Sequence, residues 1–160
     1  GQLDEIRPQL KDLVAVNKAL GIQAVYQNHS GSNYFGAPLW DLWLLFKEHP
    51  VEHLAVALDT GHTTVEGTNS WPIQANLLRP HLGALYVKDY TWIENKKTLV
   101  PLGHGNIDSG YPRRLLKSGY TGPVNLHVEY LKPFSKENVP KQIAAIKRDA
   151  ATLRKWLGWS

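Results

Sequence analysis

The sequence predicts an α/β protein built on a parallel sheet, and three features of the 160-residue chain indicate this fold class. Short apolar segments with strand character alternate four times with longer segments of helical periodicity. The strand segments are mostly apolar rather than alternating, which is typical of strands covered on both faces. The connections on one side of the expected sheet are short, which favours right-handed βαβ units.

The first element is expected to be a helix over residues 4–20. Ile6, Leu10 and Leu13 recur close to the helical period, and Gly21 is a natural stop. Gly, Pro and polar clusters delimit the later elements in the same way. These are expected to be strands at 22–28, 54–60, 83–90 and 123–130 and helices at 38–49, 71–82, 111–118 and 137–157, with loops at 29–37, 61–70 and 91–108.

The composition narrows the class of protein. With 42% hydrophobic residues, the chain is long enough for one globular domain with a sizeable core. No apolar run approaches the roughly 18 residues that a membrane helix needs, so no membrane partner is expected. The net charge of +4 is modest, and its clearest cluster falls on the last helix. A solvated helix face explains that cluster better than a nucleic-acid site.

The opening residues of the sequence and its cysteine content do not fix the cellular location of the protein. The opening GQLDEIRPQL does not resemble a signal peptide, and a chain with no Met at all is expected to be a processed or excised piece. The absence of Cys excludes disulfides and thiolate metal sites within the piece. Cytoplasmic and periplasmic locations both remain open.

Polar side chains gather near the C-terminal end of every expected strand. They are Gln27 and His29, then Asp59 and His62, then Tyr86, Lys88 and Asp89, then His127 and Glu129. Ligands of parallel α/β proteins bind at this edge of the sheet. Polar groups in a dry core cost about 2–7 kcal/mol each unless they are paired. The pattern therefore predicts a functional site.

Most of these residues also have a purely structural interpretation. Asp59 can cap the turn after its strand by accepting backbone N–H groups. Lys88 and Asp89 can form an ion pair at a strand end. His127 can be a core histidine with satisfied hydrogen bonds, and a surface loop position would explain His62.

Three further residues complete the set of candidates. Glu129 lies on a strongly apolar strand, where an unpaired carboxylate is costly, so a functional role is favoured there. His104 lies between two glycines, which suggests a mobile loop over a ligand, although backbone flexibility alone explains the glycines equally well. Trp92 follows a strand end and offers an apolar platform for a sugar ring.

Together these segments resemble the xylose isomerase-like (β/α)8 barrels, the superfamily of sugar and sugar-phosphate isomerases and epimerases. The segments are YQNHSG (26–31), ALDTGHTTVEG (57–67), LYVKDY (85–90), VPLGHGNID (100–108) and NLHVEY (125–130). Their order and spacing match the last four strands of such a barrel across essentially the whole chain. The resemblance implies that residues 1–160 are a single domain, the C-terminal half of a TIM barrel from helix 4 to helix 8. A half-barrel exposes two strand edges, which another copy or the N-terminal half would cover.

The resemblance also implies a metal site. In the metal-dependent epimerases of the superfamily, Glu, Asp, His and Glu hold a divalent cation. Asp59 and Glu129 match two of these ligands by position, whereas Gln27 stands at the first Glu and Tyr86 at the His. A Gln oxygen can still bind a hard cation, so Asp59, Glu129 and Gln27 are the expected ligands. The two changes weaken the expected site for Mn, Mg, Zn or Co.

The activity implied is that of a sugar isomerase or epimerase that abstracts a proton next to a carbonyl through an enediolate. Glu129 is the expected base. Lys88, Tyr86 or His62 would polarise the substrate oxygen, and Lys88 would supply fixed positive charge if the metal is lost. Residues expected to contact the carbohydrate are His29, His62, Lys88, Tyr86, Trp92, His104 and His127.

Other functions remain open on the same scaffold. A keto-sugar or inosose-type dehydratase would begin with the same proton abstraction. A non-catalytic carbohydrate-binding barrel is favoured by the two changed ligands, since a fold does not guarantee a function. A DNA repair enzyme like endonuclease IV needs three zinc ions and more ligands than the sequence offers.

Overall fold

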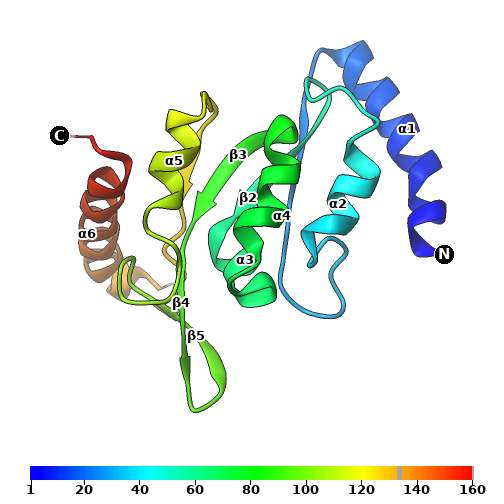
Figure 1. The fold of residues 1–160 in the computed structure, drawn as a ribbon. Helices are drawn as coiled ribbons and strands as arrows, with labels where there is room; N and C mark the ends of the chain where they lie inside the picture. Colours follow the sequence, from blue (N-terminus) through cyan, green and yellow to red (C-terminus); the bar gives the residue numbers. More distant parts are fainter. Residues whose placement is uncertain (133–134, 160) are drawn as a thin grey trace. The chain divides into compact units, whose positions relative to one another are not determined.

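The computed structural model describes residues 1–132 and 135–159, and the chain divides into two units, residues 1–84 and 85–160 (Figure 1). The first unit contains α1 (Gln2–Leu20), β1 (Ala24–Gln27), α2 (Leu39–Phe46), β2 (Leu54–Asp59), α3 (Thr60–Gly67) and α4 (Trp71–Leu78). β3 (Leu82–Val87) spans the boundary. The second unit continues with β4 (Asp89–Ile93), β5 (Lys96–Val100), α5 (Tyr111–Lys117), β6 (Val124–Leu126) and α6 (Val139–Leu157). Short 3-10 turns precede β3 and α6, at Arg79–His81 and Lys136–Asn138.

In the first unit, a helix pair lies beside a parallel strand pair. α1 ends where expected, because Gly21 adopts the left-handed conformation with φ 65° and its N–H caps the last turn. α1 and α2 lie side by side (Figure 1). β1 pairs with β2 in parallel, from Ala24 opposite Leu54 to Gln27 opposite Ala57. Both strands therefore end at the same edge.

The core of the first unit is built from α2 and β2. All six residues of β2 are buried, which confirms the prediction of a strand covered on both faces. The face of α2 that carries Leu39, Leu42 and Phe46 is also buried. α2 packs against β2 and α4, so the apolar faces of these elements exclude water together.

A helix replaces the loop expected at residues 61–70. α3 covers residues 60–67 and follows directly on β2. Most of its residues are Gly, Thr or Val, which have modest helix propensity. Asp59 nevertheless starts the helix by accepting the backbone N–H groups of Gly61 and His62. The cap outweighs the local preference of the sequence.

In the second unit, β3 pairs with β6 in parallel, from Leu85 opposite Val124 to Val87 opposite Leu126. β6 is shorter than the strand expected at 123–130, although the His127 N–H still donates to the Val87 carbonyl at 2.9 Å. α6 forms as expected and packs against α5 and β6. None of the described helices is long and apolar enough to cross a membrane.

The loop expected at residues 91–108 is in part an antiparallel hairpin. β4 and β5 pair from Asp89 opposite Val100 to Ile93 opposite Lys96. Glu94 and Asn95 form the two-residue turn with φ values of 49° and 62°, the left-handed pair that suits a tight hairpin. No glycine marks this turn, so the usual sequence signal is missing. Trp92 and Ile93, on β4 of this hairpin, are exposed.

A hydrogen-bonded tyrosine joins the segment after β6 to α6. The Tyr130 hydroxyl donates to the buried Asp149 carboxylate at 2.7 Å, and Arg148 donates to the same hydroxyl. Burial, together with the Asp149 carboxylate, raises the pKa of Tyr130 from 10 to about 12. The neutral phenol is therefore the form that the folded state favours.

The stability of the protein is expected to fall in alkali because of Tyr130. A folded pKa above the unfolded value stabilises the fold below pH 10 and loses that contribution as pH rises through about 12. Urea denaturation of wild type and Tyr130→Phe at two pH values, one below 10 and one near 12, measures the difference. The stability gap between the two proteins should narrow at the higher pH, whereas Tyr34→Phe at an exposed tyrosine serves as control. A gap that does not change with pH would contradict the assignment.

Candidate active site

In the first unit, four of the predicted site residues come together at the ends of β1 and β2. The Gln27 side-chain amide donates to Asp59 Oδ2 at 2.8 Å. The ring of His29 lies 4.8 Å from the ring of His62, centroid to centroid, and 5.1 Å from the ring of Tyr34, on which it stacks. We refer to Gln27, His29, Asp59 and His62 as the first cluster.

Asp59 has two roles in this cluster. Its side chain is completely buried. Oδ1 accepts the backbone N–H groups of Gly61 and His62 at 3.0 and 3.1 Å, so the capping interpretation holds. Oδ2 accepts the Gln27 amide on the other side. The residue therefore both starts α3 and shapes the cluster.

The contacts of His62 determine which ring nitrogen carries the proton. The backbone N–H of Ser30 donates to His62 Nδ1 at 3.1 Å, so Nδ1 is the acceptor. The neutral ring then carries its proton on Nε2, which lies 3.9 Å from Asp59 Oδ2. His62 is only 8% exposed, so it is not a surface residue. It offers an N–H donor to an oxygen in the cluster.

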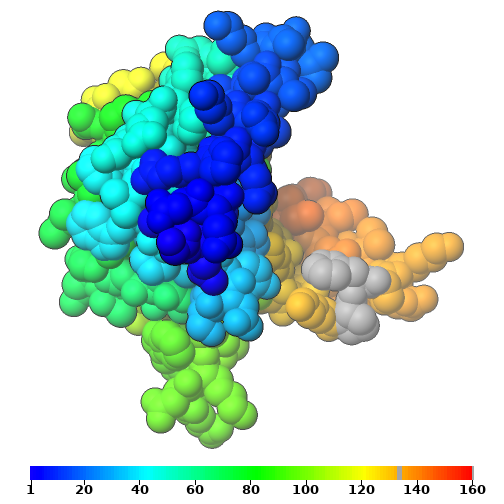
Figure 2. Space-filling view, turned by 90° about the vertical axis from the view of Figure 1, so that its right-hand side faces the viewer, coloured from blue at the N-terminus to red at the C-terminus, as the bar shows by residue number. Residues whose placement is uncertain are grey.

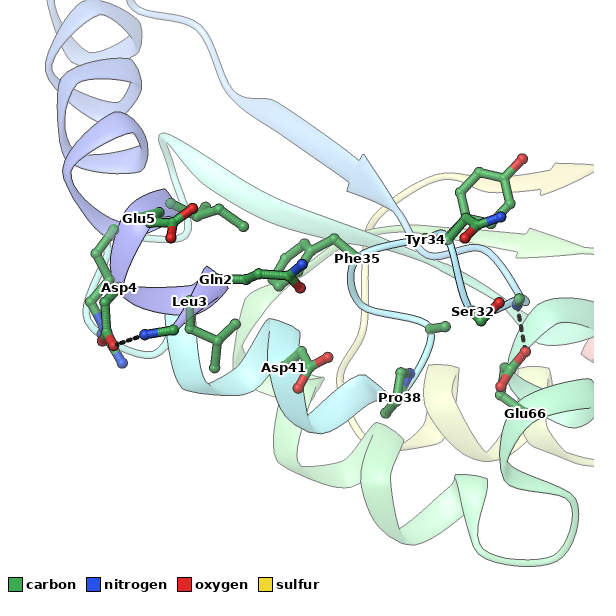
Figure 3. A pocket seen from close by; sticks show the side chains of 16 residues that line it. Gln2, Leu3, Asp4, Glu5, Ser32, Tyr34, Phe35, Pro38, Asp41 and Glu66 are labelled. Atoms are coloured by element: carbon green, nitrogen blue, oxygen red, sulfur yellow. Dashed lines mark hydrogen bonds and ion pairs between the residues drawn. The ribbon is translucent and has the colours of Figure 1, made fainter.

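An open groove with a volume of about 1140 Å³ adjoins the first cluster. Its walls are the first turns of α1 and the loop 31–38, which lie side by side in Figures 2 and 3. Tyr34, the stacking partner of His29, lines it. Asp41 and Glu66 add carboxylates, and Glu66 accepts the Gly31 backbone N–H at 2.6 Å. A groove with these acceptors suits a ligand rich in hydroxyl groups.

In the second unit, four more predicted residues come together at the ends of β3 and β6. The Lys88 ammonium lies 3.1 Å from Glu129 Oε2. His127 Nδ1 lies 3.4 Å from the other oxygen of the same carboxylate, and its ring packs 4.6 Å from the ring of Tyr86. We refer to Tyr86, Lys88, His127 and Glu129 as the second cluster.

Burial differs sharply within the central pair of the second cluster. The Lys88 side chain is 4% exposed, whereas the Glu129 side chain is 40% exposed. A buried ammonium requires a counter-charge, and the Glu129 carboxylate provides one. Because Glu129 also remains open to solvent, it can meet a ligand while Lys88 holds it.

Asp89 organises the segment that follows the second cluster. Its carboxylate accepts four backbone N–H groups, those of Tyr90, Gly103, Gly105 and Ile107, at 2.9 to 3.2 Å. These bonds fasten the loop 101–108 to the base of the hairpin and account for the burial of the carboxylate. A Cβ atom at Gly105 would lie 2.3 Å from Asp89 Oδ1. The second glycine of LGHGNID is therefore required by close packing.

Two predicted ligand-contacting residues lie on exposed segments of the second unit. Trp92 is 53% exposed on β4, and His104 is exposed on the loop that Asp89 fastens. Their predicted contact with a carbohydrate stays a prediction.

The structure adds residues that the sequence interpretation missed. Asn28 is fully buried and accepts the Asp59 backbone N–H at 2.8 Å, and Ser30 fixes the ring of His62. Both belong to the segment YQNHSG, in which the alternation of a strand points to Gln27 and His29 alone. The signal was the concentration of polar residues directly after an apolar strand.

The side chains of each cluster determine whether the expected divalent cation could bind there. Among the described residues, no group of three or more His, Cys, Asp or Glu side chains is arranged to hold a metal ion. Gln27 turns its amide nitrogen, a donor and not a ligand, toward Asp59. The residues present do not fit the cation that the resemblance implies.

Replacing Asp59 by Ala is expected to lower the free energy of unfolding by about 3 kcal/mol, because the cap and the Gln27 bond are lost together. Asp59→Asn keeps an oxygen for the cap and should lose less than half as much. Urea denaturation followed by circular dichroism measures both. Equal stability of Asp59→Ala and wild type would show that the buried carboxylate is not a structural cap.

Comparison with known proteins places this arrangement in a family. A profile of xylose isomerase-like TIM barrels matches residues 1–156. No curated protein matches the chain significantly. Similar solved structures include a D-tagatose 3-epimerase-like protein, with 17% identity over 96% of this chain and 56% of that one, at a TM-score of 0.68.

Two more solved structures are similar at the same level. A xylose isomerase domain protein from Planctomyces limnophilus has 19% identity over 97% of this chain and 53% of that one, at a TM-score of 0.70. A 3-keto-D-glucoside 4-epimerase from E. coli has 17% identity over 96% and 53%, at 0.68. The chain thus spans about half the length of these proteins, and identities this low show the fold alone. The predicted parallel α/β fold and its resemblance are confirmed, and the chain belongs to the xylose isomerase-like TIM barrel family.

Proposed function

We propose that the protein is a sugar or sugar-derivative isomerase or epimerase that abstracts a proton next to a carbonyl. The observation that carries this proposal is the Lys88–Glu129 pair, with a buried ammonium 3.1 Å from a partly exposed carboxylate. A carboxylate is a suitable base for such a proton, and a fixed positive charge stabilises the oxyanion that develops. Family membership and the names of two similar structures support the choice of substrate class.

The proposed reaction assigns one task to each group. The Glu129 carboxylate takes the proton from the carbon next to the carbonyl, and the C–H electron pair moves into the enediolate. The Lys88 ammonium offsets the charge that forms on oxygen, because a charge fixed in a buried site needs no reorganisation. Delivery of a proton from solvent or a second acid to the other face of the same carbon gives an epimer. Return of the proton from Glu129 to the neighbouring carbon, with the hydroxyl proton moving to the former carbonyl oxygen, gives an isomer.

Solvent exchange tests the proposal. The full-length protein is incubated in D₂O with a panel of ketoses and keto-sugars, and the products are followed by NMR. We expect deuterium at the carbon next to the carbonyl without loss of a hydroxyl group. Loss of water would instead identify the dehydratase alternative, which shares the first step. No exchange with any member, together with saturable binding, would favour a non-catalytic carbohydrate-binding protein.

Replacing Lys88 by Met, which keeps much of the side-chain volume, is expected to slow exchange by at least about 100-fold. The charge that stabilises the oxyanion is lost, while Glu129 remains. Initial rates of deuterium uptake measure the effect, with circular dichroism as the check on folding. Lys96→Met, at an exposed lysine of the hairpin, is the matched control. Exchange at the wild-type rate in Lys88→Met would remove Lys88 from the mechanism.

A further inference from the structure

Two positively polarised groups stand beside the two carboxylates that the family pattern would give to a metal. The Gln27 amide lies 2.8 Å from Asp59 Oδ2, and the Lys88 ammonium lies 3.1 Å from Glu129 Oε2. Each pair lies within one unit of the chain, so each is an independent observation.

The first pair removes the need for a cation at Asp59. If residue 27 were the Glu of the family pattern, its carboxylate and that of Asp59 would repel each other unless a proton or a cation lay between them. Gln27 avoids this repulsion because its N–H donates directly to the Asp59 oxygen. Oδ1 of Asp59 already accepts two backbone N–H groups, so both oxygens are satisfied by donors from the chain itself.

The second pair removes the need for a cation at Glu129. The buried ammonium of Lys88 balances the charge of the carboxylate. A divalent cation bound to the Glu129 carboxylate would lie close to the Lys88 ammonium. The two positive charges would repel each other strongly at such a short separation. Tyr86, at the position where the family pattern has a His ligand, packs its ring against His127.

We propose that the protein binds no divalent cation at Asp59 or at Glu129, and that Gln27 and Lys88 each supply the positive polarity that a cation would otherwise provide beside these carboxylates. The binding part of this inference stands independently, whereas its catalytic part rests on the proposed function. The inference concerns donor chemistry: an amide N–H and an ammonium are not metal ligands.

Placing a second carboxylate beside Asp59 tests the first pair directly. Gln27→Glu places two carboxylates together and is expected to create affinity for Mn²⁺, at least about tenfold tighter than wild type. The double variant Gln27→Glu with Asp59→Asn restores one amide and one carboxylate, and it should lose that affinity again. Gln23→Glu, at an exposed glutamine four residues earlier, controls for the added charge. Isothermal titration with MnCl₂ and the shift in Tm with added MnCl₂ are the two measurements.

The wild-type full-length protein should contain no stoichiometric Mn, Mg, Zn or Co by elemental analysis, and its Tm should not change with MnCl₂. One bound cation per chain, or equal Mn²⁺ affinity in wild type and Gln27→Glu, would overturn the inference. Failure of Gln27→Glu to gain affinity would also contradict the role of Gln27.

A chelator separates this inference from the proposed function. If exchange occurs, EDTA should leave its rate unchanged, and loss of exchange that Mn²⁺ restores would overturn the inference. If no substrate in the panel exchanges, the proposed function fails while the metal-binding results still decide the inference.

Discussion

Replacing Glu129 by Gln is expected to slow the exchange of the substrate proton by roughly 100- to 10,000-fold, the usual contribution of a general base. Gln has the same shape but cannot accept the proton. The variant also leaves the buried Lys88 ammonium without this counter-charge, so some loss of stability is expected, and circular dichroism checks that the variant is folded. Deuterium uptake in D₂O, followed by NMR at several substrate concentrations, separates the effect on kcat from the effect on KM.

The expected loss lies in kcat, since the base acts in the chemical step and not in binding. Glu52→Gln is the matched control, because it makes the same change at an exposed carboxylate in the turn before β2. A Glu129→Gln protein that exchanges at the control rate would show that another group removes the proton.

Replacing Asp89 by Ala is expected to lower the free energy of unfolding by about 3–5 kcal/mol, the largest effect on stability that we predict. Four backbone N–H groups lose their acceptor at once. Asp89→Asn should recover only part of the loss, because its NH₂ group cannot accept a backbone N–H. Urea denaturation gives the energies, and amide hydrogen exchange at residues 103, 105 and 107 should show faster opening of the loop.

Gly105→Ala probes the same contact from the other side. The added Cβ would lie 2.3 Å from both Asp89 Oδ1 and the Tyr90 carbonyl oxygen, so the loop has to shift. We expect faster amide exchange in the loop here as well. Ser109→Ala, at an exposed position just beyond the loop, is the control. If both variants were as stable as wild type, Asp89 would have no organising role.

The sequence by itself determined the elements whose signals are local. The helical period and Gly21 define α1, and the continuous apolar run of residues 54–58 defines β2. The polar residues at the strand ends could also be named in advance, because parallel strands direct their C-terminal ends to one edge. The xylose isomerase-like segments then identified the family.

The tertiary structure alone decided features that depend on contacts between distant residues. The hairpin at residues 89–100 has no glycine in its turn, and the Asp59 side chain caps α3 in a segment of modest helix propensity. The Gln27 amide meets Asp59 across 32 residues of chain, and Lys88 meets Glu129 across 41. The sequence shows which side chains are able to form hydrogen bonds or ion pairs. Only the folded backbone brings a particular donor within hydrogen-bond distance of a particular acceptor, because these bonds are short and directional.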